Sequence, residues 1–227
     1  MAKKYLRVPE LILGFDTETT GLDVGSERAI SYGFCAFRYG RPVWSEQFFV
    51  VPDRPIAPAA QRIHGLSIES IEAKRGTELV FNVEGGLAHA VGILRRYQDQ
   101  GAYIVGANVV RFDIEMLRRS YHSVVGRSLN DDSFDLSLLQ IIDVIEHDLA
   151  IEPGREDRPR RGLENLCRFY GVKPGGHEAL GDARATVEVF IEQVVRNNSG
   201  QVTLDLATPV EHPLATSNEG LPSRFRR

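Results

Sequence analysis

Cysteine is scarce in this sequence: Cys35 and Cys167 are the two examples among 227 residues. They lie far apart and lack the spacing of metal ligands, so we expect reduced, buried thiols rather than a disulfide. The sequence also contains no apolar run close to the roughly 20 residues that a membrane span needs. Its first ten residues carry charge but no apolar segment typical of a signal peptide. These absences predict a cytoplasmic protein with no membrane partner.

A positive net charge is also missing. The formal net charge is -4 and the sequence pI is about 5.9. This balance argues against a protein that coats nucleic acid through charge alone. It does not argue against an enzyme that meets phosphates through bound metal, because cations would offset the carboxylates of such a site. The hydrophobic content of 42% is normal for a globular protein.

The first part of the chain favours β-structure. A short apolar run at 11–15 and two segments rich in aromatic and β-branched residues, at 29–39 and 43–51, predict three strands. Gly40 and Pro42 mark a turn between the second and third strands. We therefore expect an antiparallel meander of three strands.

Beyond the meander, strands alternate with helices. A buried-type strand is expected at 102–107 and a fifth strand at 133–136. Apolar residues at helical spacing predict helices over 57–63, 67–74, 83–98, 112–121, 138–149, 163–170 and about 182–197. The expected fold is α/β, with a mixed five-stranded sheet flanked by helices. The expected organisation is an N-terminal extension at 1–10, one domain at 11–197 and a C-terminal tail at 198–227.

Five residues in three short motifs are candidates for chemistry. They are Asp16 and Glu18 in FDTETTG, Asp113 in NVVRFD, and His177 and Asp182 in HEALGD. The first two are two positions apart at the end of a strand, so both side chains lie on one face of the sheet. Carboxylates suit hard cations such as Mg²⁺ and Mn²⁺. Two such cations can activate a water and stabilise the leaving oxygen of a phosphodiester.

Each motif alone also has a structural interpretation. Asp113 and Asp182 fall at predicted helix starts, where a carboxylate is a common cap. An isolated Asp-x-Glu pair is common, and an isolated histidine is typical of a surface or a core. Independent caps would not be expected together with a strand-end Asp-x-Glu and a histidine five positions before the last aspartate. The combination therefore favours a two-metal site that cleaves phosphodiesters.

The three motifs resemble, in the same order, the exonuclease motifs of the DEDDh 3′–5′ exonucleases in the ribonuclease-H-like superfamily. The likeness is greatest to the proofreading epsilon subunits of bacterial DNA polymerase III. RIHGLS at 62–67, FDLSLL at 134–139 and GLENLCRFYGV at 162–172 resemble further family segments. Position 177 is histidine and position 178 is glutamate rather than tyrosine, as in the histidine-dependent branch.

The resemblance implies specific roles. Asp16, Glu18, Asp113 and Asp182 would bind two Mg²⁺ or Mn²⁺ ions, and His177 would act as the general base. The products implied are nucleoside 5′-monophosphates released from a single-stranded 3′ end. The DNA or RNA nature of that end stays open, as does a non-catalytic nucleic-acid-binding protein on the same fold.

The resemblance also suggests substrate contacts, with ordinary core packing as the alternative for the two apolar ones. These residues are Thr17, Thr19, Leu22, His64, Asn108 and Phe112. Stacking on an aromatic ring is possible for any base, so we expect weak sequence preference.

One pattern stands out in the tail. Gln201, Leu204 and Leu206 resemble the short peptides by which polymerase partners dock on a sliding clamp, with two leucines entering an apolar pocket. An extra edge strand packed on the domain is the alternative.

Overall fold

The computed structural model describes residues 7–129, 136–154 and 162–198. In these ranges six strands form one sheet in the order β4-β3-β2-β1-β5-β6. Their bounds are β1 Leu11–Thr19, β2 Ala29–Arg38, β3 Arg41–Val50, β4 Val80–Phe81, β5 Tyr103–Gly106 and β6 Gln140–Asp143. β1, β2 and β3 form the predicted antiparallel meander, and β5 and β6 continue the sheet parallel to β1. The predicted mixed α/β fold is confirmed.

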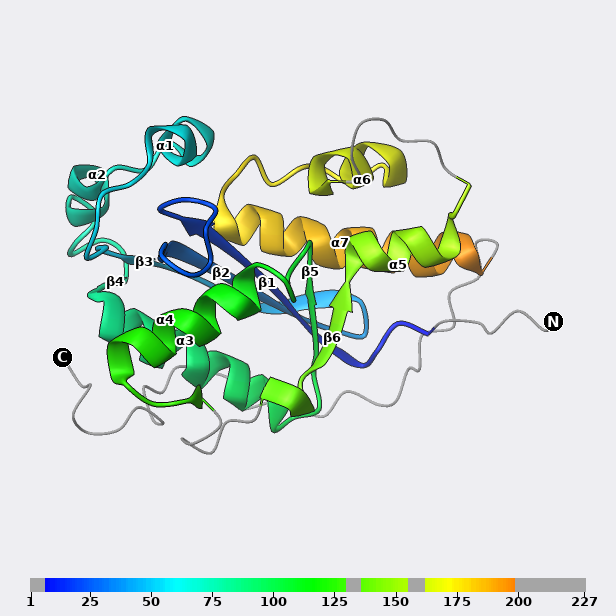
Figure 1. Ribbon diagram of the computed structural model, residues 1–227. Coiled ribbons are helices and arrows are strands. Elements are labelled where there is room, and N and C mark those ends of the chain that lie inside the picture. The colour runs from blue at the N-terminus through cyan, green and yellow to red at the C-terminus, as the bar shows by residue number, and fades with distance from the viewer. Residues whose placement is uncertain (1–6, 130–135, 155–161, 199–227) are drawn as a thin grey trace.

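Helices cover both faces of this sheet (Figure 1). Their bounds are α1 Pro58–His64, α2 Ile68–Glu72, α3 Val83–Gln98, α4 Asp113–Val125, α5 Val144–Ile151, α6 Leu163–Tyr170 and α7 Ala179–Asn197. α3 and α4 pack on one face, whereas α5, α6 and α7 pack on the other. None of the helices in the described ranges combines the length and hydropathy needed to cross a membrane.

The sheet has six strands rather than the expected five. The predicted strand at 133–136 is wrong at its end, because Leu136–Leu138 forms a 3₁₀ turn, and 133–135 lie outside the described residues. The strand of this region is β6, which pairs with β5 in parallel inside a segment predicted to be helical. A short apolar run fits a buried strand and a helix equally well. The sixth strand, β4, has two residues, too few for any periodic pattern.

Two helix starts also differ from expectation. α5 begins at Val144 because the Asp143 side chain accepts a hydrogen bond from the Ile145 N–H at 3.0 Å and caps the helix. α7 begins at Ala179, three residues before the predicted start. Asp182 therefore lies one turn inside the helix rather than at its first residue.

Side chains of β1 alternate between two cores. Leu13 packs with the cluster under α3 and α4, whereas Ile12 packs with the cluster under α6 and α7. The same alternation places Asp16 and Glu18 on the α7 face and Thr17 on the α4 face. Candidate site residues of β1 therefore lie on both faces of the sheet.

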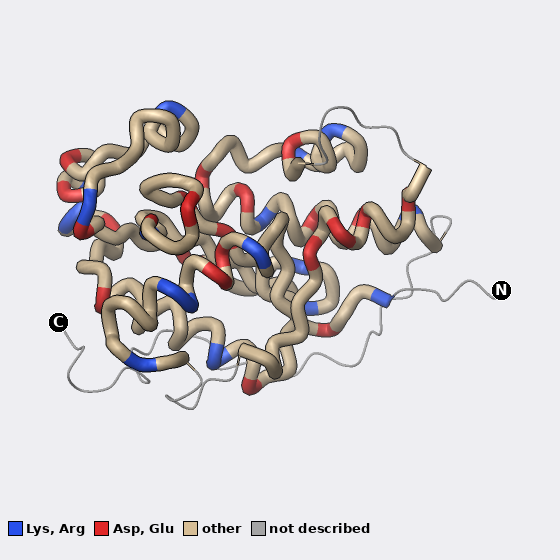
Figure 2. The backbone as a smooth tube through the Cα atoms, viewed as in Figure 1, with Lys and Arg blue, Asp and Glu red and all other residues tan. Residues whose placement is uncertain are grey.

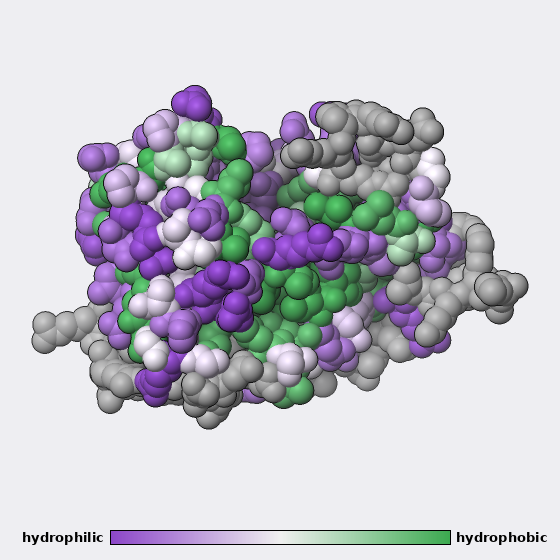
Figure 3. Space-filling view, in the orientation of Figure 1, coloured by the Kyte–Doolittle hydropathy of each residue, from purple (hydrophilic) through white to green (hydrophobic). Residues whose placement is uncertain are grey.

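The surface is unevenly polar. On the side shown in Figure 3, apolar side chains gather over β6 and between α5 and α6, and the end that carries α1 and α2 is more polar. Leu138, just before β6, and Leu149, in α5, are exposed apolar side chains, at 67% and 46%. Val8, within the expected N-terminal extension, is 5% exposed and packs in the α7-side core.

Candidate active site: carboxylates at the end of β1

Three carboxylates meet where β1 ends and α7 begins. Asp16, Glu18 and Asp182 each offer an oxygen within 4.8 Å of the others. All three side chains are partly buried, and Figure 2 shows acidic positions gathering in this part of the molecule. The structure therefore brings together three of the four acidic residues that the sequence singles out.

A close contact between sheet and helix makes this geometry possible. A Cβ added to Gly14 on β1 would lie 2.3 Å from the Ala183 carbonyl oxygen of α7. On β2, a Cβ added to Gly33 would meet the backbone of Ala179 just as closely. Because neither glycine has a side chain, the first turns of α7 rest directly on the strands. Asp182 is thereby brought next to the β1 carboxylates.

Asp113 approaches the cluster from the other layer. It is the first residue of α4, and its side chain is 3% exposed. The Thr17 hydroxyl donates a hydrogen bond of 2.6 Å to Asp113 Oδ1. Asp113 is not one of the three residues whose oxygens converge, but its charge helps to raise the pKa values of Asp16 and Glu18.

Burial and mutual repulsion make the cluster electrostatically costly. Burial, followed by the charges of Asp113, Asp182 and Glu18, raises the pKa of Asp16 well above its ordinary value. Burial, then Asp182 and Asp113, raises the pKa of Glu18 to about 8. Burial also raises the pKa of Asp182. These are the shifts expected of neighbouring carboxylates that lack a compensating cation.

Asp113 experiences opposing influences. Burial raises its pKa to about 7, while hydrogen bonds from the Thr17 hydroxyl and from the backbone N–H groups of Asp113 and Thr17 lower it. The charge of Asp143 also raises it. Asp113 is not the N-cap of α4, which is Phe112 and makes no side-chain cap hydrogen bond. A ligand role for Asp113 is compatible with these surroundings.

His177 lies just before α7 on an exposed stretch. Its backbone is in the left-handed region, with φ of 60°. The His177 N–H and the Gly175 N–H donate hydrogen bonds to the Asp182 carboxylate, and both lower the pKa of Asp182. The charge of His177 is a larger influence in the same direction. The histidine is thus tied to the cluster through its backbone, and its ring remains exposed to solvent.

The predicted substrate residues near β1 lie in different environments. Leu22 is 82% exposed on the loop after β1. It is therefore not packed in the core, the alternative considered for this residue. Thr19 is buried, and its hydroxyl donates to the Gly21 carbonyl at 2.7 Å. Thr17 faces Asp113, as described above.

His64 uses both ring nitrogens within the protein. The Leu66 N–H donates to Nδ1 at 3.0 Å, so Nδ1 is the acceptor and Nε2 carries the proton. Nε2 donates to the Thr19 carbonyl at 3.2 Å. Burial is the main cause of a lowered His64 pKa, and the nearby charge of His177 acts in the same direction. His64 therefore ties α1 to the end of β1.

The two remaining candidates flank the start of α4. Asn108 is exposed, with a left-handed φ of 59°. Phe112 is half-buried, packs against the α3 and α4 core, and immediately precedes the helix. Core packing therefore buries part of the Phe112 ring.

The exonuclease (RNase_T) family matches residues 13–190 of this chain. The chain belongs to the exonuclease family.

Relatives in sequence include proteins named as parts of DNA polymerase III. The "DNA polymerase III subunit epsilon" of Rickettsia conorii is 29% identical over 220 residues, covering 92% of this chain and 83% of the relative. The protein of the same name from Treponema pallidum is 25% identical, covering 81% and 76%. The "DNA polymerase III PolC-type" of Thermotoga petrophila is 27% identical over 79% of this chain, which spans 11% of that relative's length.

The fold of this exonuclease-family chain also has solved counterparts. A zinc-bound complex of E. coli ExoI with single-stranded DNA superposes with a TM-score of 0.65, at 21% identity. The match covers 83% of this chain and 41% of that chain. At this identity the likeness shows a shared fold.

The acidic cluster suits the metal dependence of the exonuclease family. Its donors are carboxylate oxygens, the atoms that hard divalent cations prefer. Burial is the main cause of the raised pKa values of Asp16, Glu18 and Asp182, and neighbouring acidic charges add to it for Asp16 and Glu18. A bound cation would offset both effects. The residues present therefore fit a divalent cation.

Sequence patterns missed one acid of this region. Asp143 ends β6 at the edge of the sheet where Asp16 and Glu18 lie, and its charge acts on Asp113. The available signal was an apolar run ending in aspartate, the pattern that located Asp16. Because that run was predicted to be helical, Asp143 was not identified as a strand-end acid.

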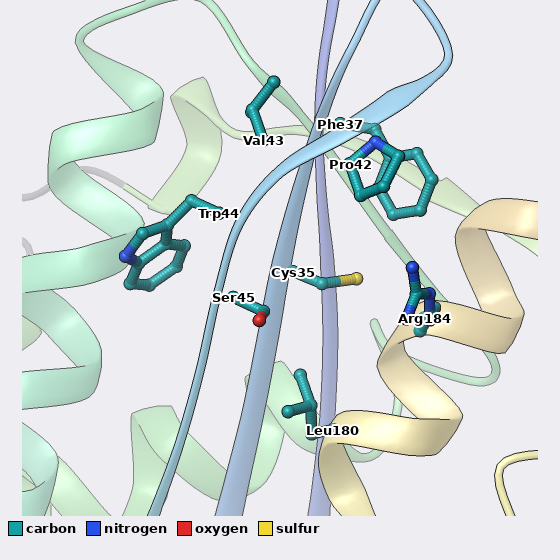
Figure 4. A pocket seen from close by; sticks show the side chains of 8 residues that line it. All are labelled: Cys35, Phe37, Pro42, Val43, Trp44, Ser45, Leu180 and Arg184. Atoms are coloured by element: carbon teal, nitrogen blue, oxygen red, sulfur yellow. The ribbon is translucent and has the colours of Figure 1, made fainter.

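A separate cavity of about 300 Å³ lies beside the start of α7. It is lined by Cys35, Phe37, Pro42, Val43, Trp44, Ser45, Leu180 and Arg184 (Figure 4). None of the cluster carboxylates is among these described residues, and burial raises the pKa of the Cys35 thiol to about 12. This cavity is therefore not the metal site.

Proposed function

We propose that this chain is a metal-dependent 3′–5′ exonuclease that hydrolyses single-stranded DNA ends to nucleoside 5′-monophosphates. The observation that carries the proposal is the convergence of Asp16, Glu18 and Asp182 within 4.8 Å in a member of the exonuclease family. Residues 11–197 would form the catalytic domain.

Asp16, Glu18 and Asp182 would bind the cations, with Asp113 supporting the second of two. Mg²⁺ or Mn²⁺ in such a site activates the attacking water and stabilises the leaving oxygen of the phosphodiester. The carboxylates contribute by fixing the position of the positive charge. As the pH rises through their raised pKa values, the carboxylates lose their protons. The crowded negative charges are then stabilised by a bound cation.

His177 would accept the proton of the attacking water. Its ring is exposed, and its backbone N–H contacts the Asp182 carboxylate. His177 lies just before α7, and Asp182 lies in the first turn of that helix. Imidazole is the side chain that most often serves as a general base.

Single-stranded DNA is the preferred substrate in this proposal. The support comes from relatives named as DNA polymerase III proteins and from the ExoI complex with single-stranded DNA. Leu22, at 82% exposed, offers an apolar side chain against which a terminal base could pack. A cytoplasmic role beside a replicative polymerase, in proofreading or repair, fits the same relatives.

The test uses 3′-tailed single-stranded DNA and matched RNA, each with Mg²⁺, Mn²⁺ or EDTA. We expect monophosphates from DNA in the presence of metal, and none in EDTA or from Asp16→Ala. Asp99→Ala, at an exposed helix end, is the matched control and should remain active. Activity of Asp16→Ala, or activity in EDTA, would refute the two-metal site. Preference for RNA would redirect the proposal to an exoribonuclease, and binding without cleavage to a non-catalytic protein.

The clamp-binding peptide remains part of the proposal. Gln201, Leu204 and Leu206 lie outside the described residues. Removal of residues 200–227 should abolish sliding-clamp binding and leave exonuclease activity intact. Unchanged clamp binding by the shortened chain would disprove this assignment.

A further inference from the structure

We propose that Thr17 is a positioning residue that fixes the Asp113 carboxylate beside the metal site, rather than a contact to the nucleic acid. This inference rests on the proposed function and refines it. It reverses the role suggested for Thr17 by family resemblance.

The first support is a direct hydrogen bond. The Thr17 hydroxyl donates to Asp113 Oδ1 at 2.6 Å, and both side chains are buried. The two residues are 96 positions apart in the chain. A short contact to a carboxylate is stronger than a neutral hydrogen bond, so it links the end of β1 firmly to the start of α4.

The second support comes from the direction of the side chain. Along β1, Asp16 and Glu18 lie on the α7 face, where they meet Asp182. Thr17 lies between them and therefore points to the opposite, α4 face. It is 7% exposed, which leaves little surface for a nucleotide. The alternation that directs the neighbouring acids to the metal site directs Thr17 to Asp113.

The third support is a gap in the sheet beside β1. The parallel pairing with β5 ends at the pair Gly14–Val105. Beyond it, Thr17 has no partner on β5 in this register, and its hydroxyl donates to the Asp113 side chain instead. The Thr17 hydroxyl is therefore a donor that determines where this carboxylate lies.

This arrangement divides the Asp113 carboxylate between two tasks. Oδ1 accepts the Thr17 hydroxyl, and the charge of the same carboxylate acts on Asp16 and Glu18. Without the hydroxyl, rotation of the carboxylate would be less restricted. Groups that orient a metal-binding carboxylate typically affect metal affinity or activity by about 10–100-fold when they are removed.

The experiment compares Thr17→Val, which keeps the shape, with Thr17→Ser, which keeps the hydroxyl. Mn²⁺ binding is measured by calorimetry on the whole protein, and kcat and KM are measured on single-stranded DNA. Thr186→Val is the matched control, because its buried hydroxyl donates to the Ala183 carbonyl at 2.8 Å. If the valine variant is unfolded by circular dichroism, Thr17→Ala compared with Thr17→Ser provides the same contrast.

We expect Thr17→Val to weaken one Mn²⁺ binding event by about tenfold or more and to lower kcat at unchanged KM. Thr17→Ser should restore both. In an Asp113→Asn background, Thr17→Val should add little, because both changes affect one group. Full additivity, or a raised KM with unaltered Mn²⁺ binding, would overturn the proposal in favour of a substrate contact.

The same measurements separate this inference from the proposed function. Wild-type protein that binds Mn²⁺ but releases no monophosphate would refute the proposed exonuclease activity. The effect of the Thr17 variants on Mn²⁺ affinity could still be measured. Wild-type protein that binds no Mn²⁺ would overturn both.

Discussion

Gly33 of β2 lies against Ala179, the first residue of α7, so closely that a Cβ on Gly33 would be 2.1 Å from the Ala179 carbonyl carbon. It would also be 2.2 Å from the carbonyl oxygen. Both neighbours are backbone atoms, which cannot move aside without displacing the helix. Since Asp182 is three residues beyond Ala179, the position of the metal site depends on the absence of a side chain at Gly33.

Gly33→Ala is therefore expected to lower the free energy of unfolding by about 1–3 kcal/mol, the usual cost of overpacking. It should also lower metal affinity, because Asp182 moves with α7. Urea unfolding and Mn²⁺ calorimetry measure the two effects. Gly92→Ala is the control, because Gly92 lies in α3 and has nothing within 4 Å of its added Cβ. That change should stabilise by roughly 0.5–1 kcal/mol. Equal stabilities for the two variants would contradict the close-contact argument.

Stability without metal should fall as the pH rises from about 5 to 8. The folded-state pKa values of Glu18 and Asp113 are raised to about 8 and about 7. A raised carboxylate pKa means that the folded state binds more protons than the unfolded state in this window. The stability that these two groups contribute is therefore fully present below their ordinary pKa values, and it is lost as the pH rises through the raised values. Thermal unfolding in EDTA across this range measures the slope.

Glu18→Gln isolates the carboxylate contribution to that slope. The variant removes one charge from the cluster, so its melting temperature in EDTA should depend less steeply on pH than that of the wild type. Glu84→Gln, in the first turn of α3, is the control and should retain the wild-type slope. An unchanged slope for Glu18→Gln would disprove the assignment to this cluster.

Divalent metal should stabilise the protein more at pH 8 than at pH 6. Deprotonated carboxylates bind cations, whereas protons compete for the same oxygens at the lower pH. At metal concentrations near 100 times the dissociation constant, the gain is about 2.7 kcal/mol, which corresponds to roughly 5–11 °C for a domain of this size. Melting curves with Mg²⁺ and with Mn²⁺ test this, and Asp16→Asn should lose the shift. Equal shifts at the two pH values would count against the cluster as the metal site.

His177→Ala should lower kcat by about 10²–10⁴-fold, the usual contribution of a general base. Metal binding should remain, because His177 contacts Asp182 through its backbone N–H, which alanine retains. The rate profile between pH 6 and 9 and Mn²⁺ calorimetry check the two parts. His122→Ala, at an exposed position on α4, is the matched control. Loss of metal binding in His177→Ala would indicate a structural role instead.

The sequence predicts the meander and the shared face of Asp16 and Glu18 because these depend on local pattern. Period-two alternation places Asp16 and Glu18 on one face, and the structure agrees. The proximity of Asp182 follows from the order of the motifs in the family, not from periodicity. The contact that makes this proximity possible involves Gly33. A single glycine leaves no periodic pattern in the sequence, so this contact could not be predicted.

Two features required the tertiary structure. Gln140–Asp143 is a strand because β5 offers a parallel edge, a partner that lies more than 30 residues away. The orientation of Thr17 follows from strand alternation, yet its partner Asp113 is 96 positions distant. Short elements and side-chain partners set by non-local pairing leave no periodic trace in the sequence.

Asn108 and His177 share an unusual backbone state, with φ values of 59° and 60°. Each stands five residues before an acid of the site, Asp113 or Asp182. Glycine adopts this conformation without strain. Asparagine and histidine are among the other residues that adopt it most often, but glycine remains the least strained choice. A sequence shaped by folding stability alone would favour glycine at both positions. The chain instead has an amide and an imidazole there, so at these two turns the proposed chemistry and the stability of the backbone make opposite demands.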